Sequence, residues 1–287
     1  MRNTHIDANA TDEVIRLENV WVQYDGVPVL EDVNLVVREG DFIGVIGPNG
    51  GGKTTLLRTI LGLTKPSRGS VTVLGTSPLK GRRFVGYVPQ YSSFDRDFPA
   101  SAWDVVLMGR LGHTGCFRRY TEEDRAVATA ALRAVEMLDL KDRQIGRLSW
   151  GQRQRILIAR ALAAEPKALL LDEPAAALDS QIEAGLYDLL RALNEKVTIV
   201  MVSHDIGVIS TYVKSIACLN RRLVYHNSRE ITRDMLSVAY ECPVDLIAHG
   251  LAHRVLDTHE EVADMTRGAV SANTHGAMSN TYEEVRE

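Results

Sequence analysis

The sequence lacks any apolar run long enough to cross a membrane as a helix. Its longest apolar stretches are short, as in Phe42–Ile46, Ala168–Leu171 and Val197–Val202, whereas a spanning helix needs about 20 predominantly apolar residues. Residues 1–12 are polar and lack the apolar core of a secretory signal peptide. We therefore expect a protein without a transmembrane segment or a cleaved leader.

Cysteine is scarce, and positive charge is not in excess. The three cysteines, Cys116, Cys218 and Cys242, are far apart and outside the spacings of metal sites, so we interpret them as reduced thiols in a cytosolic protein. Lysine and arginine number 33 against 37 aspartates and glutamates, and no basic stripe stands out. A nucleic-acid partner is therefore not expected.

The composition is that of an ordinary globular protein with a core, since 45% of the residues are hydrophobic and 24% are charged. A chain of 287 residues is long for one compact domain and indicates a main domain with a subdomain or extensions. Residues 14–37 alternate apolar and polar positions around an Asp25-Gly26 turn. This pattern predicts two paired strands at the start of the fold.

Strands and helices alternate along the rest of the chain. Strands are predicted at residues 42–46, 71–74, 84–88, 168–171 and 197–202, and helices from about residue 53, after Thr121 and over 179–194. This order predicts a parallel, buried sheet with helices on its faces. Residues 91–165 differ from the flanking segments in their sequence pattern. Apolar residues recur there at helical spacing, which indicates a helical subdomain.

A glycine-rich loop stands between the strand at 42–46 and the helix that follows it. Its residues, Gly47-Pro48-Asn49-Gly50-Gly51-Gly52-Lys53-Thr54, match G-x-x-x-x-G-K-[ST] and are followed by Thr55. In such a loop backbone N–H groups point at phosphate oxygens, the lysine reaches the β and γ phosphates, and the hydroxyl ligates Mg²⁺. A simple turn that ends a strand is the alternative, but the strand–helix context favours a nucleotide site for ATP.

Two acids end the apolar strand at residues 168–171. Solvated acids can cap any strand, but strand ends in open α/β sheets are where ligands bind. Beside a phosphate loop, Asp172 is expected to hold the Mg²⁺ shell and Glu173 to orient or deprotonate the attacking water.

The segment Leu148-Ser149-Trp150-Gly151-Gln152-Arg153-Gln154-Arg155, shortly before the acid pair, resembles the signature L-S-G-G-Q of the ABC ATPase family. The resemblance extends from about Val14 to Leu256, and Trp150 departs from it by replacing the first glycine. In this family the signature of one subunit closes over ATP held by the other, so Ser149, Gly151 and Gln152 would contact that nucleotide. Ser149 and Gln152 also read as a capping box at a helix start, and both roles can hold together.

Other residues match family positions on weaker individual evidence. The resemblance assigns Tyr24 to stacking on adenine, Gln90 to Mg²⁺ and the attacking water, Asp179 to the loop between subunits, and His204 to the γ-phosphate. Gln90 by itself would carry almost no signal, and the other three have plainer alternatives. Tyr24 could be a core aromatic, Asp179 a helix N-cap, and His204 a structural histidine.

Residues 94–110 and 242–256 resemble the zinc, manganese and chelated-iron branch of bacterial ABC importers. That resemblance implies a homodimer of ATPase subunits, bound at the cytoplasmic face of the membrane to a multi-span permease. An extracytoplasmic metal-binding protein would belong to the same system. The permease is expected to contact the helical subdomain near Gln90 to Arg110.

Two other functions stay open at this point. A non-transport ABC ATPase in translation or DNA maintenance would usually have two cassettes or a long coiled coil, and neither is seen. A nucleotide-binding regulator with little turnover is suggested by Trp150, although Lys53, Asp172 and Glu173 are intact.

The resemblance implies an α/β fold, a P-loop NTPase core with an N-terminal antiparallel β lobe and an inserted α-helical subdomain. The expected boundaries are a tail at 1–13, the core at 14–90 and 166–235, the helical subdomain at 91–165, a C-terminal extension at 236–261 and a flexible tail at 262–287. In the extension His249 and His253 are four apart. With His259 they would suit Zn²⁺ if the segment is helical, and incidental histidines are the alternative.

Trp150 leaves a further alternative open. Its indole could lie at the edge of the dimer interface against the other subunit's nucleotide, or it could pack within its own helical subdomain, because tryptophan suits either position.

Overall fold

The computed structural model describes residues 12–90, 98–115, 118–176, 178–226, 246–249 and 251–254. Contacts divide the chain into residues 1–244 and residues 245–287, and each unit is described by itself. Within the described ranges, no helix combines the length and apolar character that crossing a membrane would require.

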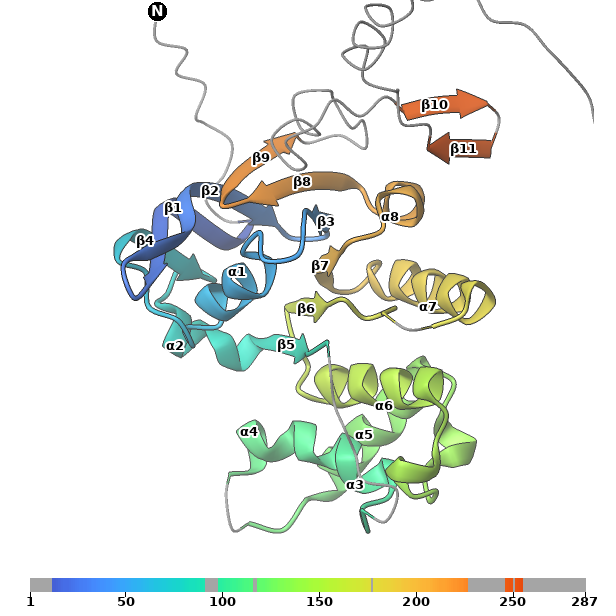
Figure 1. The fold of residues 1–287 in the computed structure, drawn as a ribbon. Helices are drawn as coiled ribbons and strands as arrows, with labels where there is room; N and C mark the ends of the chain where they lie inside the picture. The colour runs from blue at the N-terminus through green and yellow to red at the C-terminus, as the bar shows by residue number, and fades with distance from the viewer. Residues whose placement is uncertain are drawn as a thin grey trace, which may run out of the picture. The chain divides into compact units, whose positions relative to one another are not determined.

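An antiparallel sheet forms the start of the first unit. It has the order β2-β1-β4, with β1 at Glu13–Tyr24, β2 at Val27–Arg38 and β4 at Arg68–Val73. The tight turn between β1 and β2 falls at Asp25 and Gly26, which both have positive φ. The predicted hairpin is confirmed, and its blue strands lie at the left of the unit, near α1, in Figure 1.

A six-stranded sheet lies at the centre of the unit in the order β5-β6-β7-β3-β8-β9. Its strands are β3 (Phe42–Ile46), β5 (Val85–Val88), β6 (Ala168–Asp172), β7 (Thr198–Ser203), β8 (Ser215–Asn220) and β9 (Arg222–His226). The pairs from β5 through β8 are parallel, and only β9 runs antiparallel to its neighbour. The parallel strand ends that carry the predicted site residues therefore lie along one edge.

Side-chain alternation along the central strands divides the core in two. Phe42 and Ile46 belong to one buried cluster, and Ile43 and Val45 belong to the other. The same alternation recurs in β6, β7 and β8, because successive side chains of a strand point to opposite faces. The antiparallel sheet and α1 (Lys53–Ile60) cover one face, and most of the remaining helices cover the other. A sheet buried on both faces explains why these strands are nearly all apolar.

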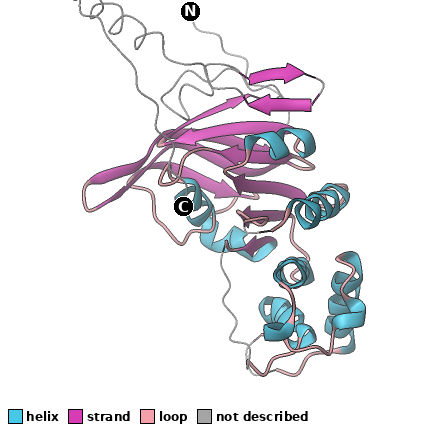
Figure 2. Ribbon diagram, turned by 45° about the vertical axis from the view of Figure 1, so that its right-hand side comes forward, coloured by secondary structure: helices cyan, strands magenta, loops and turns pink. Residues whose placement is uncertain are grey.

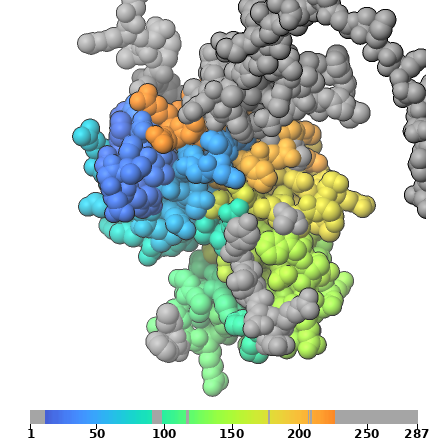
Figure 3. Space-filling view, viewed as in Figure 1, coloured from blue at the N-terminus to red at the C-terminus, as the bar shows by residue number. Residues whose placement is uncertain are grey.

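Most of the helices between β5 and β6 lie together at one end of the unit (Figure 2). They are α3 (Ala102–Leu107), η2 (Met108–Arg110), α4 (Leu111–Thr114), α5 (Glu122–Ala134), η3 (Leu138–Leu140), η4 (Ile145–Arg147) and α6 (Trp150–Ala163). Outside this segment lie α2 (Pro78–Gly81), η1 (Arg82–Phe84), α7 (Ser180–Leu193) and α8 (Ile206–Tyr212). In Figure 3 the green residues of the helical segment form a projection below the body of the unit.

Capping boxes start three of these helices. Ser101 with Asp104 begins α3, Thr121 with Asp124 begins α5, and Ser149 with Gln152 begins α6. In each box the hydroxyl accepts a backbone N–H while the third helical residue accepts the N–H of the cap. The predicted helix start after Thr121 is confirmed.

A buried ion pair fastens the helical segment. The Arg110 guanidinium donates to Asp124 at 3.0 Å and to the Ala163 carbonyl at 2.9 Å, and it also contacts Glu165. Arg110 and Asp124 are each only 4% exposed. A backbone hydrogen bond from Thr121, together with those of Arg110, holds the pKa of the Asp124 carboxyl well below its usual range.

In the second unit, residues 246–249 and 251–254 are paired strands rather than a helix. β10 (Leu246–His249) pairs antiparallel with β11 (Leu251–Arg254), so His249 faces Leu251 and His253 faces Ile247 in the register. The zinc hypothesis for His249 and His253 assumes a helix, and that assumption is wrong. His259 and the predicted tail at 262–287 lie outside the described residues, and the described part of the chain contains no group of three or more potential metal ligands.

The predicted fold class is confirmed as a mixed α/β architecture, with an antiparallel sheet and a mainly parallel sheet in the first unit. Observed strand and helix limits lie within a few residues of those expected from the sequence. The domain boundaries stay a prediction, although α3 to α6 fall inside residues 91–165.

Candidate functional site

The glycine-rich loop connects β3 to α1 at the edge of the central sheet. The backbone at Gly47 passes so close to the neighbouring strand β8 that a Cβ there would overlap the Leu219 carbonyl oxygen. Gly52 precedes the helix with φ 97°, a conformation that favours glycine. The loop can therefore curl at the N-terminus of α1, which is the backbone arrangement that binds phosphate.

Lys53 extends over this loop and is held by the loop's own carbonyls. Its Nζ donates to Gly47 O at 2.9 Å and to Pro48 O at 3.0 Å, and it lies 3.8 Å from Glu173 Oε1. The residue is only 6% exposed. Burial lowers the pKa of the Lys53 ammonium, and the carboxylates of Glu173 and Asp172 oppose that shift. The ammonium thus lies between the carbonyls of the glycine-rich loop and the Glu173 carboxylate.

Asp172 ends β6 beside the first turn of α1. Its two carboxylate oxygens accept hydrogen bonds from the Thr54 hydroxyl at 3.3 Å and from the Tyr87 hydroxyl at 3.4 Å. Burial raises the pKa of the Asp172 carboxyl, and the Thr54 hydrogen bond opposes the shift. A hydroxyl and a carboxylate oxygen this close form a hard donor set of the kind that Mg²⁺ prefers, so the residues fit the ion.

Tyr87 was not expected from the sequence. It lies in β5, next to β6 in the sheet, and burial raises the pKa of its phenol to about 12. The hydroxyl therefore stays protonated as a donor to Asp172. Only the adjacency of β5 and β6 brings it there, and the sequence pattern does not contain that information.

Glu173 is the residue on which several segments converge. Its Oε2 accepts a hydrogen bond from Gln90 Nε2 at 2.6 Å and lies 3.4 Å from His204 Nδ1. Its backbone has φ 47°, and its N–H donates to Val202 O at 3.0 Å. The structure thus brings together Lys53, Gln90, Glu173 and His204.

A small cavity of about 140 Å³ adjoins Glu173. Its lining includes His204 and Asp205 from the end of β7, and Glu183 from the first turn of α7. Burial raises the pKa of Glu183, and the nearby Asp205 adds to that shift. Glu183 is a second residue of this site that sequence reasoning missed, because a single acid in a helix carries no signal.

The remaining residues expected in the site make their described contacts with segments other than the phosphate loop. Ser149, Gly151 and Gln152 begin α6, whose buried side chains belong to the core on the opposite face of the sheet from those of α1. Asp179 caps α7 by accepting from the Ile182 N–H at 3.0 Å. Tyr24 ends β1, is 45% exposed and shares a hydrogen bond with Thr64. Within one chain, α1 and α6 thus pack on opposite faces of the central sheet.

Comparisons with known proteins agree with this geometry. The family model described as ABC transporter matches residues 30–176. The manganese transport system ATP-binding protein MntB of Bacillus subtilis is 44% identical over 211 residues, covering 73% of this chain and 84% of that protein. The zinc uptake system ATP-binding protein ZurA of Listeria innocua is 38% identical over 222 residues, covering 76% and 86%.

Solved structures give the same result. An inward-facing transporter described as of the metal-chelate ABC type has a TM-score of 0.74 and 31% identity, and covers 85% of this chain and 97% of its own. A dimeric ATP-binding cassette in a post-hydrolysis state with ADP and phosphate has a TM-score of 0.65 and 32% identity, and covers 76% and 100%. Because the sequence match includes the phosphate loop, the signature and the acid pair, and the structural match extends over most of the chain, this protein belongs to the ABC transporter family.

Proposed function

We propose that this chain is the ATP-hydrolysing subunit of an ABC importer for a divalent metal, zinc or manganese, or for chelated iron. The observation that carries the proposal is the convergence of Lys53, Gln90 and His204 on the Glu173 carboxylate. The named functions of MntB and ZurA support the choice of cargo. A non-transport ATPase and a low-turnover regulator are not favoured.

The reaction is in-line attack of water on the γ-phosphate. Lys53, cradled by the loop carbonyls, offers its charge to the β and γ phosphates. Glu173 accepts a proton from, or orients, the attacking water, and its carboxylate is aimed by Gln90 Nε2. His204 lies beside it and contacts the γ-phosphate. Catalysis here is positioning and charge stabilisation rather than covalent chemistry.

Thr54 and Asp172 would hold Mg²⁺ in this site, with Gln90 at its edge. When bound, the ion neutralises charge on the β and γ phosphates. The rest of the cradle, Gly47 to Gly52 with Thr55, supplies backbone N–H groups and side-chain contacts to the phosphates, and Tyr24 supplies an aromatic face to the adenine.

Two subunits form the working unit. Ser149, Gly151 and Gln152 of one copy complete the site of the other, and Asp179 lies in the loop between subunits. ATP contacts both halves and favours the closed dimer, whereas loss of the γ-phosphate favours opening. The packing of α1 and α6 on opposite faces of the central sheet within one chain supports this arrangement.

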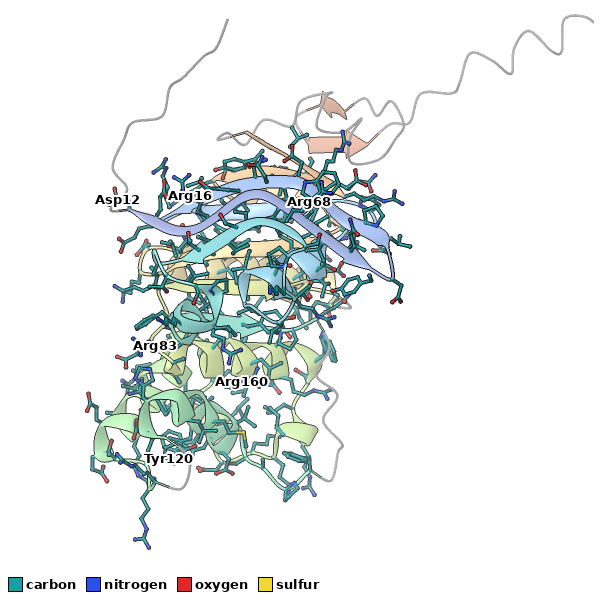
Figure 4. The ribbon with its side chains drawn as sticks, turned by 90° about the vertical axis from the view of Figure 1, so that its left-hand side faces the viewer. Asp12, Arg16, Arg68, Arg83, Tyr120 and Arg160 are labelled. Carbon is teal, nitrogen blue, oxygen red and sulfur yellow. The ribbon has the colours of Figure 1, made fainter. Side chains whose placement is uncertain are left out.

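A membrane permease docks on the cytoplasmic side, and an extracytoplasmic metal-binding protein delivers the cargo. A groove of about 740 Å³ beside α2 and η1 offers a further apolar surface on which a partner could dock. It is lined by Leu61, Leu63, Leu79 and Phe84 and rimmed by Lys80 and Arg83, and Leu63 and Leu79 are strongly exposed. Figure 4 labels Arg83 of η1 and Arg160 of α6, which lie where the sheet-containing core meets the helical segment.

The test is transport by the assembled system. The tagged chain is purified from its native membranes, the copurifying multi-span protein is identified, and the complex is reconstituted in liposomes. ATP-dependent uptake of radioactive Mn²⁺, Zn²⁺ or chelated iron is then measured, with the Lys53→Ala complex as control. Hydrolysis without any copurifying permease would contradict the importer assignment, and absence of hydrolysis from the assembled complex would favour a regulator.

A further inference from the structure

Trp150 is attached to the loop that follows the acid pair of its own chain. It is the first residue of α6, and its indole N–H donates to the Ala176 carbonyl at 3.1 Å. Ala176 belongs to the loop between β6 and α7. The indole therefore neither packs solely within the helical segment nor stands free, but connects that segment to the core.

The loop that receives this hydrogen bond is tied directly to Glu173. The Ala176 N–H donates to Glu173 O at 3.1 Å, and the Glu173 N–H donates to Val202 O at 3.0 Å. Two successive hydrogen bonds thus lead from the indole of Trp150 to the backbone of Glu173. A displacement of the start of α6 would therefore shift the Glu173 backbone, which sets the direction of the Glu173 carboxylate.

A second, apolar contact joins the same two segments. A Cβ at Gly151 would lie 2.7 Å from Ile182 Cγ2, so the first turn of α6 packs closely on the first turn of α7. The Arg153 guanidinium lies 5.5 Å from the indole centroid on the same helix, within the range of a cation–π contact. The ring is therefore held on one side by Arg153 while its N–H is directed at Ala176.

We propose that Trp150 is a positioning residue that couples the two ATP sites of the dimer. This inference rests on the proposed function. Ser149, next to Trp150, caps α6 and faces the nucleotide of the other subunit, while the indole leads to Glu173 of its own site. Closure over one ATP is thereby transmitted to the water-orienting group of the other. A glycine at this position has no side chain and could not make the connection.

The test compares three variants of the full-length protein with wild type. Trp150→Phe keeps an aromatic ring but removes the N–H that donates to Ala176 O. Trp150→Gly removes the entire side chain. Trp21→Phe is the matched control, because Trp21 is a tryptophan of the antiparallel sheet, in β1, whose ring lies beside Arg68. Phosphate release is measured against ATP concentration to obtain kcat, KM and the Hill coefficient. Binding of a fluorescent ATP analogue and thermal unfolding are followed in parallel.

We expect wild type and Trp21→Phe to hydrolyse ATP cooperatively. Both Trp150 variants should bind the analogue as wild type does, lose cooperativity towards a Hill coefficient of about one, and lose about two- to tenfold in kcat, the effect of one hydrogen bond. A well-folded Trp150→Phe with unchanged Hill coefficient and kcat overturns the coupling role.

Two further outcomes also overturn it. One is a loss of kcat that follows a lowered melting temperature in both Trp150 variants while cooperativity is kept, since that is a purely structural effect. The other is a wild-type chain without ATP turnover, which removes the proposed function and this inference together. Normal wild-type turnover with unaffected Trp150 variants removes only the inference.

Discussion

Replacing Glu173 by glutamine changes one carboxylate oxygen to an amide group of nearly the same size. The Gln90 amide can still donate to the remaining oxygen, which it now reaches at 2.6 Å. Lys53 keeps its hydrogen bonds to Gly47 O and Pro48 O. The phosphate cradle should therefore stay intact, and the change removes only the negative charge and the proton-accepting oxygen.

The expected effect is a large loss of turnover with little loss of binding. General-base catalysis contributes typically about 10²–10⁴-fold, which corresponds to about 3–5 kcal/mol in the activation free energy. Binding of ATP should hold or improve, because the carboxylate that lies 3.8 Å from Lys53 Nζ no longer competes with the phosphates for the ammonium. ATP should then trap a closed dimer that cannot hydrolyse it.

The assay combines phosphate release with size-exclusion chromatography in the presence of Mg²⁺ and ATP. Glu195→Gln serves as the control, because Glu195 is an exposed acid just after α7 and should leave both measurements at the wild-type level. Glu173→Gln should elute as a dimer with ATP and as wild type without it. A variant that hydrolyses ATP at nearly the wild-type rate would remove Glu173 from the mechanism.

Three further predictions follow from the same contacts. Lys53→Ala should weaken binding of a fluorescent ATP analogue, and unchanged affinity with unchanged turnover would contradict the assignment of the phosphate loop. Tyr87→Phe removes a hydroxyl that donates to Asp172, so half-maximal turnover should need about two- to tenfold more Mg²⁺; equal Mg²⁺ dependence would limit the tyrosine to packing. Asp124→Asn should lower the melting temperature most at neutral pH. The pKa of Asp124 is depressed in the folded state by hydrogen bonds from Thr121 and a buried arginine, so its stabilisation is present above the unfolded pKa of about 4 and is lost as pH falls further. A difference in melting temperature between wild type and Asp124→Asn that stays the same at low pH would refute this.

Much of the site could be predicted from the sequence, because its parts follow buried strands in recognisable order. The phosphate loop follows β3 and the acid pair follows β6, and the short apolar runs before them mark those strands plainly. Contacts between distant segments could not be predicted in the same way. Tyr87 meets Asp172 only because β5 lies beside β6, and Trp150 meets Ala176 only because α6 packs on the loop before α7.

The C-terminal histidines show how periodicity can mislead in a short segment. His249 and His253 are four apart in the sequence, but residues 246–249 and 251–254 pair as antiparallel strands. A spacing of four fits one face of a helix, but a few residues carry too little pattern to distinguish a helix from two short strands.

The order of the strands explains why this site needs residues from so many parts of the chain. Gln90, Glu173, His204 and the phosphate loop follow β5, β6, β7 and β3, which are consecutive neighbours in the sheet. Their carboxyl ends therefore meet along one edge, where ligands of open α/β sheets bind. Glu173 is the member that departs from ordinary strand geometry, since its φ of 47° is a conformation that costs a non-glycine residue of order 1–3 kcal/mol. The bond from its N–H to Val202 O on β7 supports that conformation, and the turn directs the carboxylate towards Gln90 and His204. The backbone of one residue thus links the strand that ends in Asp172 to the strand that ends beside His204.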